Sequence, residues 1–127
     1  MPFETRNRDT LALHGGSFRA ESTFGATAVP IYFSSSFQFG SSERAHRLAN
    51  LEEAGFTYSR VGNPTNDALE TRIAAVEGGA AALAVASGQA ATALSVLTLV
   101  QAGDNIVVDT GLYGGSWNFF NHRLRQF

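Results

Sequence analysis

The feature that most limits how this chain can fold is a stretch without charged residues, 78–103. Its length would allow it to cross a bilayer, since a membrane helix needs about 20 apolar residues. It is rich in alanine, however, and is interrupted at Ser87, Gly88, Gln89, Thr92, Ser95 and Thr98. We therefore predict no membrane span but a buried strand at 81–87, followed by a helix over 88–101 that ends at Gly103.

A second helix signal lies directly before this stretch. Asn63 is suited to cap a helix, and Pro64 is suited to the first helical position, where no N–H is needed. The glycine pair at 78–79 is suited to end the helix. Spacings of four and three predict one apolar face, formed by Leu69, Ile73 and Val76.

A further strand at 105–109 and a helix within 112–127 extend this pattern. The order of helix, strand, helix, strand and helix is typical of an α/β fold with a mostly parallel sheet. Because stable sheets usually hold about four to six strands, two strands indicate an incomplete domain. Asp104 and Asp109 flank the second strand, and we expect them to finish turns.

The N-terminal third lacks this organisation. Residues 1–42 show no helical periodicity and are rich in Gly, Ser, Thr and Phe, so we expect an extended arm that packs on another part of the protein. A helix is expected over 42–54, with Leu48 and Leu51 on one face. We thus divide the chain into an arm with a short helix, 1–57, and the first part of an α/β domain, 58–127.

Charge and composition exclude several classes of function. The formal net charge is −2, which argues against nucleic acid or an acidic membrane as a partner. Cysteine is absent and the N-terminus lacks the apolar segment of a secretory signal, so we expect a cytoplasmic protein. The histidines have no metal-ligand spacing, and no metal site is predicted. All nine basic residues are arginines, and the sequence contains no lysine.

The predicted turn between strand 81–87 and the next helix is a candidate anion site. Free backbone N–H groups and the positive end of the helix dipole meet at such a turn, which suits phosphate. Gly88 lets a ligand approach the backbone, and Gln89 can donate a hydrogen bond from its side-chain amide. The alternative is an ordinary strand-to-helix turn with Ser87 as its N-cap.

Two further candidate ligand-binding groups contain tyrosine or arginine side chains. Tyr58 and Arg60, two residues apart on a segment expected to be extended, point the same way and can bind one phosphate together. Tyr113 follows the second strand and so lies at the same sheet edge as Gly88, where its ring can stack on a flat ligand and its hydroxyl can move protons. The alternatives are a surface arginine beside a half-buried tyrosine, and a tyrosine packed under the following Gly-Gly turn.

The order of several motifs resembles one enzyme family over nearly the whole chain. They follow one another as in the Cys/Met-metabolism (trans-sulfuration) family of pyridoxal-phosphate enzymes: TLALHGG, AVPIYFSSSFQF, YSRVGNPT, LETRIAAVEGG, ASGQAA, GDNIVV and LYGGS. ASGQAA and LYGGSWNFF look most like the O-acetylhomoserine sulfhydrylase branch. Cystathionine γ-synthase, cystathionine lyases and methionine γ-lyase share most of these motifs. One departure is Phe33, where many relatives have glutamine.

The resemblance implies a fold, a cofactor and a role for each candidate residue. The fold is the aspartate-aminotransferase type (fold type I), usually a homotetramer of two tight dimers, and the cofactor is pyridoxal phosphate. Gly88 and Gln89 correspond to residues that hold the cofactor phosphate within a subunit. Tyr113 corresponds to the tyrosine that stacks on the pyridine ring and assists proton transfer. Tyr58 and Arg60 correspond to a pair that reaches the cofactor phosphate of the neighbouring subunit.

The missing lysine limits what these residues can do alone. Pyridoxal phosphate is held as a Schiff base on a lysine amine, and the family's lysine lies well beyond residue 127. The resemblance thus implies the N-terminal part of an enzyme that replaces the acetate of O-acetyl-L-homoserine with sulfide to give homocysteine, and a 127-residue chain that is inactive by itself. The alternatives are another reaction of the family, or a truncated, non-catalytic chain that binds phosphate or joins an oligomer.

Overall fold

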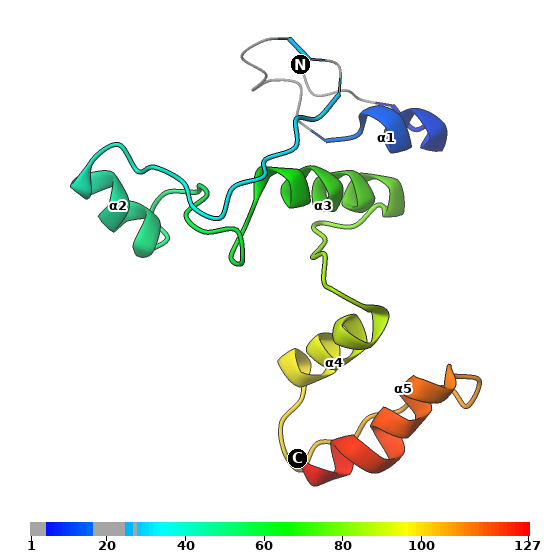
Figure 1. The fold of residues 1–127 in the computed structure, drawn as a ribbon. Helices are drawn as coiled ribbons and strands as arrows, with labels where there is room; N and C mark the ends of the chain where they lie inside the picture. Colours follow the sequence, from blue (N-terminus) through cyan, green and yellow to red (C-terminus); the bar gives the residue numbers. More distant parts are fainter. Residues whose placement is uncertain (1–4, 17–24, 27) are drawn as a thin grey trace. The chain divides into compact units, whose positions relative to one another are not determined.

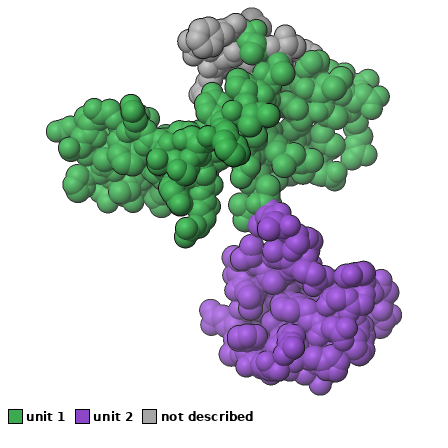
Figure 2. Space-filling model, viewed as in Figure 1, with its two compact units in different colours: residues 1–84 green, residues 85–127 purple. Residues whose placement is uncertain are grey.

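A computed structural model describes most of the chain and contains five α-helices in the described part. The described residues are 5–16, 25–26 and 28–127. The other positions of the expected N-terminal arm, 1–4, 17–24 and 27, lie outside them. Contacts group the chain into two units, residues 1–84 and residues 85–127, which Figure 2 shows in different colours. The division expected at 57/58 stays a prediction.

The first helix, α1 (Arg8–His14), lies in a segment for which we expected an extended chain. Its start is set by Asn7, whose side chain accepts hydrogen bonds from two backbone N–H groups of the first turn. A helix of 7 residues is too short to show apolar periodicity, and the expectation is wrong here for that reason. α1 packs against α3 (Figure 1), and a Cβ added at Gly15 would lie 3.3 Å from the Cβ of Ala75.

The helix α2 (Ser42–Ala49) begins at the expected residue but ends before Ala54. Leu51 lies beyond it with a left-handed φ of 58° and is 90% exposed, so it does not share a buried face with Leu48, which is 5% exposed. Two ion pairs join the segment after α2 back to this helix. They join the Glu53 carboxylate to Arg44 and Arg47, at 2.8 and 3.0 Å.

The helix α3 (Pro64–Glu77) begins and ends where the sequence predicted. The Asn63 side chain accepts a backbone hydrogen bond of 2.8 Å from the first turn. Gly78 ends the helix with a left-handed φ of 69°. The predicted apolar face is only partly covered within the described chain, since exposure is 52% and 47% at Leu69 and Ile73.

The second unit contains α4 (Gly88–Leu99) and α5 (Gly114–Asn118). A π-helical turn, Phe119–Arg123, and a 3₁₀ turn, Leu124–Gln126, continue α5 to the end of the chain. Both helices occur where the sequence predicted helix. In the described part of the protein, no helix has the length and apolar character needed to cross a bilayer.

The two predicted strands do not form in the structure. Residues 81–87 and 105–109 have no strand partner, and Leu83 and Val107 are 74% and 98% exposed rather than buried. Their apolar pattern indicates burial, but a strand also needs ladder hydrogen bonds to a neighbour, and the described residues provide none for either segment. The prediction of two buried strands is therefore wrong for the described chain, and the mostly parallel sheet stays a prediction.

Candidate functional site

The first candidate group stands at the start of α4. Ser87 caps this helix, because its hydroxyl accepts a hydrogen bond of 3.1 Å from the Ala90 N–H. The backbone N–H groups of Gly88 and Gln89 have no acceptor among the described residues. A Cβ added at Gly88 would meet no atom within 4 Å. The helix start thus combines an ordinary capped turn with two open N–H donors, which is the arrangement that suits a phosphate.

Residues before and within α5 meet the side chain of Gln89. Its Nε2 atom donates a hydrogen bond of 3.0 Å to the hydroxyl of Ser116, which is 9% exposed. A Cβ added at Gly115 would lie 2.7 Å from Cε1 of Tyr113 and 3.2 Å from Nε2 of Gln89. The structure therefore brings Gln89 and Tyr113 together around the bare backbone of Gly115. It also gives one donor of the Gln89 amide a protein partner.

Tyr113 has the exposure that a stacking surface needs. It directly precedes α5 and is 77% exposed. Its ring lies against Gly115 on one edge, but it is not buried under the Gly-Gly turn as the alternative interpretation required. Its hydroxyl has no hydrogen-bond partner among the described residues, so the Oη atom is open to a ligand.

Tyr58 and Arg60 also come together, but by a different geometry from the one predicted. Tyr58 forms a single antiparallel bridge with Ser36, and its carbonyl then accepts hydrogen bonds from the N–H groups of Val61 and Gly62, at 2.9 and 3.1 Å. The prediction of an extended segment is therefore wrong, because the chain turns directly after Tyr58. The guanidinium carbon of Arg60 lies 5.6 Å from the centre of the Tyr58 ring, a cation–π contact. Arg60 has no ion-pair partner among the described residues, so its donors stay available.

Asn63 carries a second role that the sequence interpretation missed. Its oxygen caps α3 as predicted, while its Nδ2 atom donates to the carbonyl of Tyr32 and to the hydroxyl of Ser59, both at 3.0 Å. A signal was available, because an N-cap uses only the amide oxygen and leaves two donors of a buried asparagine to be satisfied. Ser116 was missed as well, since nothing in LYGGS marks its hydroxyl as the partner of Gln89.

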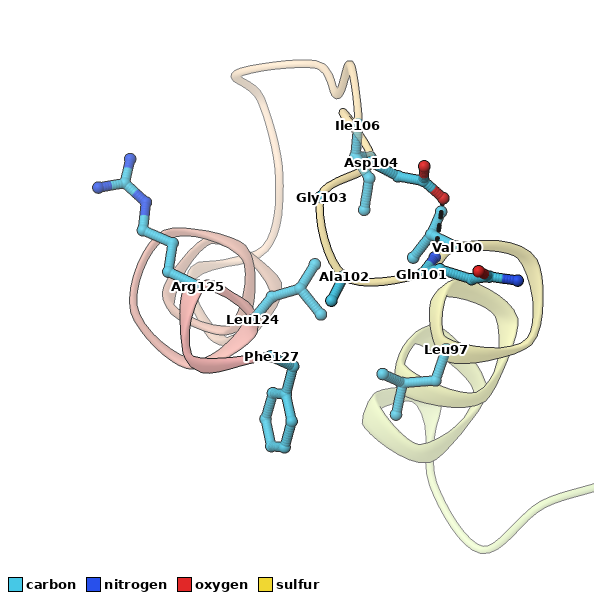
Figure 3. A pocket seen from close by; sticks show the side chains of 10 residues that line it. All are labelled: Leu97, Val100, Gln101, Ala102, Gly103, Asp104, Ile106, Leu124, Arg125 and Phe127. Atoms are coloured by element: carbon cyan, nitrogen blue, oxygen red, sulfur yellow. Dashed lines mark hydrogen bonds between the residues drawn. The ribbon is translucent and has the colours of Figure 1, made fainter.

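A cavity of about 220 Å³ lies at the other end of α4 and is not part of this site (Figure 3). Its lining is mostly apolar, and Arg125 points away from it in Figure 3. The carboxylate of Asp104 accepts a hydrogen bond of 2.8 Å from the Gln101 N–H, and that of Asp109 accepts one of 2.6 Å from the Gly111 N–H. Both aspartates finish turns, as predicted. The charged residues among those that line the cavity are Asp104 and Arg125.

Comparison with known proteins identifies the family. The family described as Cys/Met metabolism PLP-dependent enzyme matches residues 9–127. The chain belongs to this family. The prediction of the trans-sulfuration family is thus confirmed, and pyridoxal phosphate is the cofactor on which the family depends.

Individual members of the Cys/Met metabolism family match the chain closely. It is 52% identical over 118 residues to O-acetyl-L-homoserine sulfhydrylase 1 of Thermus thermophilus, covering 93% of this chain and 28% of that protein. It is 43% identical over 127 residues to an L-methionine gamma-lyase of Fusobacterium nucleatum, covering 100% of this chain and 32% of that protein. The chain therefore spans less than one third of the length of these relatives.

A solved structure supports the fold type. A Campylobacter jejuni O-acetylhomoserine (thiol)-lyase, solved with N'-pyridoxyl-lysine-5'-monophosphate, matches with a TM-score of 0.88 at 40% identity. The match covers 97% of this chain and 30% of that chain. The start of α4, with two free N–H donors and an open glycine, and the exposed Tyr113 ring before α5 fit such a cofactor.

Proposed function

We propose that this chain is the N-terminal part of a pyridoxal-phosphate-dependent O-acetylhomoserine sulfhydrylase. The enzyme replaces the acetate of O-acetyl-L-homoserine with sulfide and yields homocysteine. The observation that carries the proposal is the meeting of the Gln89 side chain, from the open start of α4, and the exposed Tyr113 ring at Gly115. The 52% identity with the Thermus sulfhydrylase supports the choice of reaction.

In this proposal, α4 binds the cofactor phosphate, and Tyr113 contacts the cofactor ring and transfers protons. The N–H groups of Gly88 and Gln89 donate hydrogen bonds to the phosphate, and the positive end of the α4 dipole stabilises the negative charge of the phosphate. The bound cofactor supplies an electron sink for proton removal and for loss of the leaving group. The Tyr113 ring stacks on it, while the Oη atom carries protons during the elimination.

Tyr58 and Arg60 are proposed to serve the phosphate of a neighbouring subunit. Arg60 is exposed and has no ion-pair partner among the described residues, so its guanidinium donors are available to bind a phosphate in the two-bond geometry that arginine favours. This role makes the enzyme an oligomer, which we propose to be a dimer of dimers. The other partners are the amino-acid substrate and sulfide, and the location is the cytoplasm.

The absence of lysine supports the proposal that the 127-residue chain is inactive alone. The Schiff-base amine must come from another part of the enzyme. The isolated chain with pyridoxal phosphate should show no Schiff-base absorption that survives dialysis. A persistent yellow band together with sulfhydrylase turnover would contradict this point.

The reaction is tested in the full-length enzyme with O-acetyl-L-homoserine and sulfide. We expect homocysteine and acetate in equal amounts, and little reaction when sulfide is left out. The second candidate is a methionine γ-lyase, which the match to the Fusobacterium enzyme over the whole chain favours. Release of methanethiol, ammonia and a keto acid from L-methionine, without homocysteine synthesis, would support the second candidate over the first.

Mixed oligomers test the role across subunits. In a hybrid of Arg60→Ala and Tyr113→Phe subunits, a site that takes Tyr113 from one subunit and Arg60 from the other is intact. At a cofactor concentration too low to load Arg60→Ala, we expect such hybrids to recover activity that neither variant shows alone. If Arg60 serves its own subunit, every site in the hybrid keeps one defect and no activity returns.

A further inference from the structure

Asn63 uses its whole side-chain amide within the protein. It is 8% exposed, and its Nδ2 atom donates to the Tyr32 carbonyl and to the Ser59 hydroxyl while its Oδ1 atom accepts from the Thr65 N–H. The orientation of the amide is determined by its partners, because a carbonyl only accepts and a backbone N–H only donates. Both donors and the acceptor are thus satisfied, as expected for a buried asparagine.

Ser59 and Thr65 bind the same segment as Asn63. The Ser59 hydroxyl donates to the Ser34 carbonyl, and the Thr65 hydroxyl accepts a hydrogen bond of 2.9 Å from the Tyr32 N–H. We call the side chains of Ser59, Asn63 and Thr65 the arm clasp. Its three members connect the arm to the start of α3 across more than 20 residues of sequence.

The arm clasp, together with backbone hydrogen bonds between the arm and residues 58–62, fixes the turn that contains Tyr58 and Arg60. Ser59 lies between these two residues, and its N–H donates a hydrogen bond of 2.9 Å to the Ser35 carbonyl. The Tyr58 carbonyl accepts the two backbone hydrogen bonds that close the turn. Asn63 follows the turn directly and binds Ser59 within it. The path of the backbone at Arg60 is therefore fixed from both sides by the arm and by α3.

We propose that Asn63 is a positioning residue for phosphate binding, acting through the arm clasp on Tyr58 and Arg60. The inference rests on the proposed phosphate role of those two residues. Asn63 does not contact the ligand; it holds the turn so that the guanidinium is presented with its donors free. The clasp uses backbone groups of the arm, so it does not depend on the Phe33 side chain, which is fully exposed.

The test separates the clasp from the helix cap. Serine caps a helix about as well as asparagine, but it cannot reach Tyr32 and Ser59 with an amide. In the full-length enzyme, Asn63→Ser should therefore keep α3 and weaken pyridoxal-phosphate affinity about 10- to 100-fold, the scale of a misplaced binding group. Turnover at saturating cofactor should change much less. Cofactor titration by absorbance and thermal unfolding of the apo form measure the two effects.

A double-mutant cycle with Arg60→Ala distinguishes positioning from a general loss of structure. If Asn63 acts through Arg60, Asn63→Ser should weaken the cofactor affinity little further once Arg60 is gone. Equal losses in both backgrounds would overturn the inference, as would full affinity in Asn63→Ser. Ser59→Ala, which removes one partner of Asn63, should show the same dependence on Arg60 if the serine variant unfolds. An unchanged affinity in Arg60→Ala alone would instead overturn the proposed phosphate role.

Discussion

The two candidate groups are built in different ways. In residues 1–84, the turn of Tyr58 and Arg60 is tied to the arm and to α3 by hydrogen bonds from Ser59, Asn63 and Thr65. In residues 85–127, all of which are described, the start of α4 and the start of α5 share a single side-chain hydrogen bond, from Gln89 to Ser116. The geometry of the first group is set by several polar contacts, most of which reach residues more than 20 positions away in the sequence. The second depends on steric fit at one glycine and on neighbouring segments that are unpaired and exposed.

The largest expected effect concerns Tyr113, whose hydroxyl has no hydrogen-bond partner among the described residues. Tyr113→Phe keeps the ring and removes the Oη atom, so cofactor binding should persist while turnover falls about 10²- to 10⁴-fold, the usual contribution of a positioned acid or base. Steady-state turnover at saturating cofactor and a cofactor titration measure the two quantities. Unaltered turnover would reject the proton-transfer role.

A smaller effect is expected for Arg60. Arg60→Ala removes charge-assisted hydrogen bonds worth about 1.5–3 kcal/mol, so cofactor affinity should fall about 10- to 150-fold. Arg60→Lys keeps the charge without the planar pair of donors and should give an intermediate loss. Equilibrium titration of the apoenzyme with pyridoxal phosphate provides the measurement. A lysine variant as weak as the alanine variant would show that the two parallel hydrogen bonds, rather than the charge, provide the affinity.

The steric fit in the second unit is tested by two adjacent glycines. A Cβ at Gly115 would lie 2.7 Å from the Tyr113 ring, whereas a Cβ at Gly114 would meet nothing within 4 Å. Gly115→Ala should therefore displace the ring and reduce cofactor affinity about tenfold, while Gly114→Ala should leave it near the wild-type value. Equal affinities in the two variants would show that the contact at Gly115 does not determine the position of the ring.

Local signals explain what the sequence predicted correctly. The Asn-Pro start and the Gly-Gly end of α3 act within one turn of the helix, and both were found at the predicted residues. The early end of α2 was missed because nothing in the local pattern marks Leu51 for its left-handed φ of 58°. The buried strands were predicted from apolar pattern alone, which does not report whether a neighbouring strand is present.

In the candidate groups too, features set by neighbouring residues were predicted, and a feature set by a distant partner was not. The helix start at Gly88 was predicted because its cap lies one residue away. The closeness of Tyr58 and Arg60 was also predicted, although a turn rather than a strand produces it. The arm clasp was not predicted, because the partner of the Asn63 amide lies 31 residues earlier in the sequence. A pattern of residue types cannot supply such a pairing.

The smallest expected effect is an acid sensitivity confined to the first unit. Hydrogen bonding from Arg44, with Arg47 contributing less, lowers the pKa of Glu53 below its ordinary value. The folded state therefore holds this proton less tightly than the unfolded state does. The stabilisation is fully present above about pH 4.3, the ordinary value for glutamate, and is lost as the pH falls through the lower folded-state pKa. Residues 85–127 contain no ion pair, so α4 should lack this dependence.

Hydrogen exchange of the full-length enzyme at pH 6 and near pH 3.5 can measure this difference. Protection of α2 should fall on acidification by more than protection of α4, and the change should be small because exposed ion pairs contribute little. In Glu53→Gln, protection of α2 should be lower than wild type at pH 6 and should approach it at the acid pH. Glu52→Gln is the matched control, since Glu52 has no ion-pair partner among the described residues. A difference in α2 protection between wild type and Glu53→Gln that is the same at both pH values would contradict this expectation. That result would show that packing of the 50–55 segment, rather than the carboxylate charge, stabilises this part of the first unit.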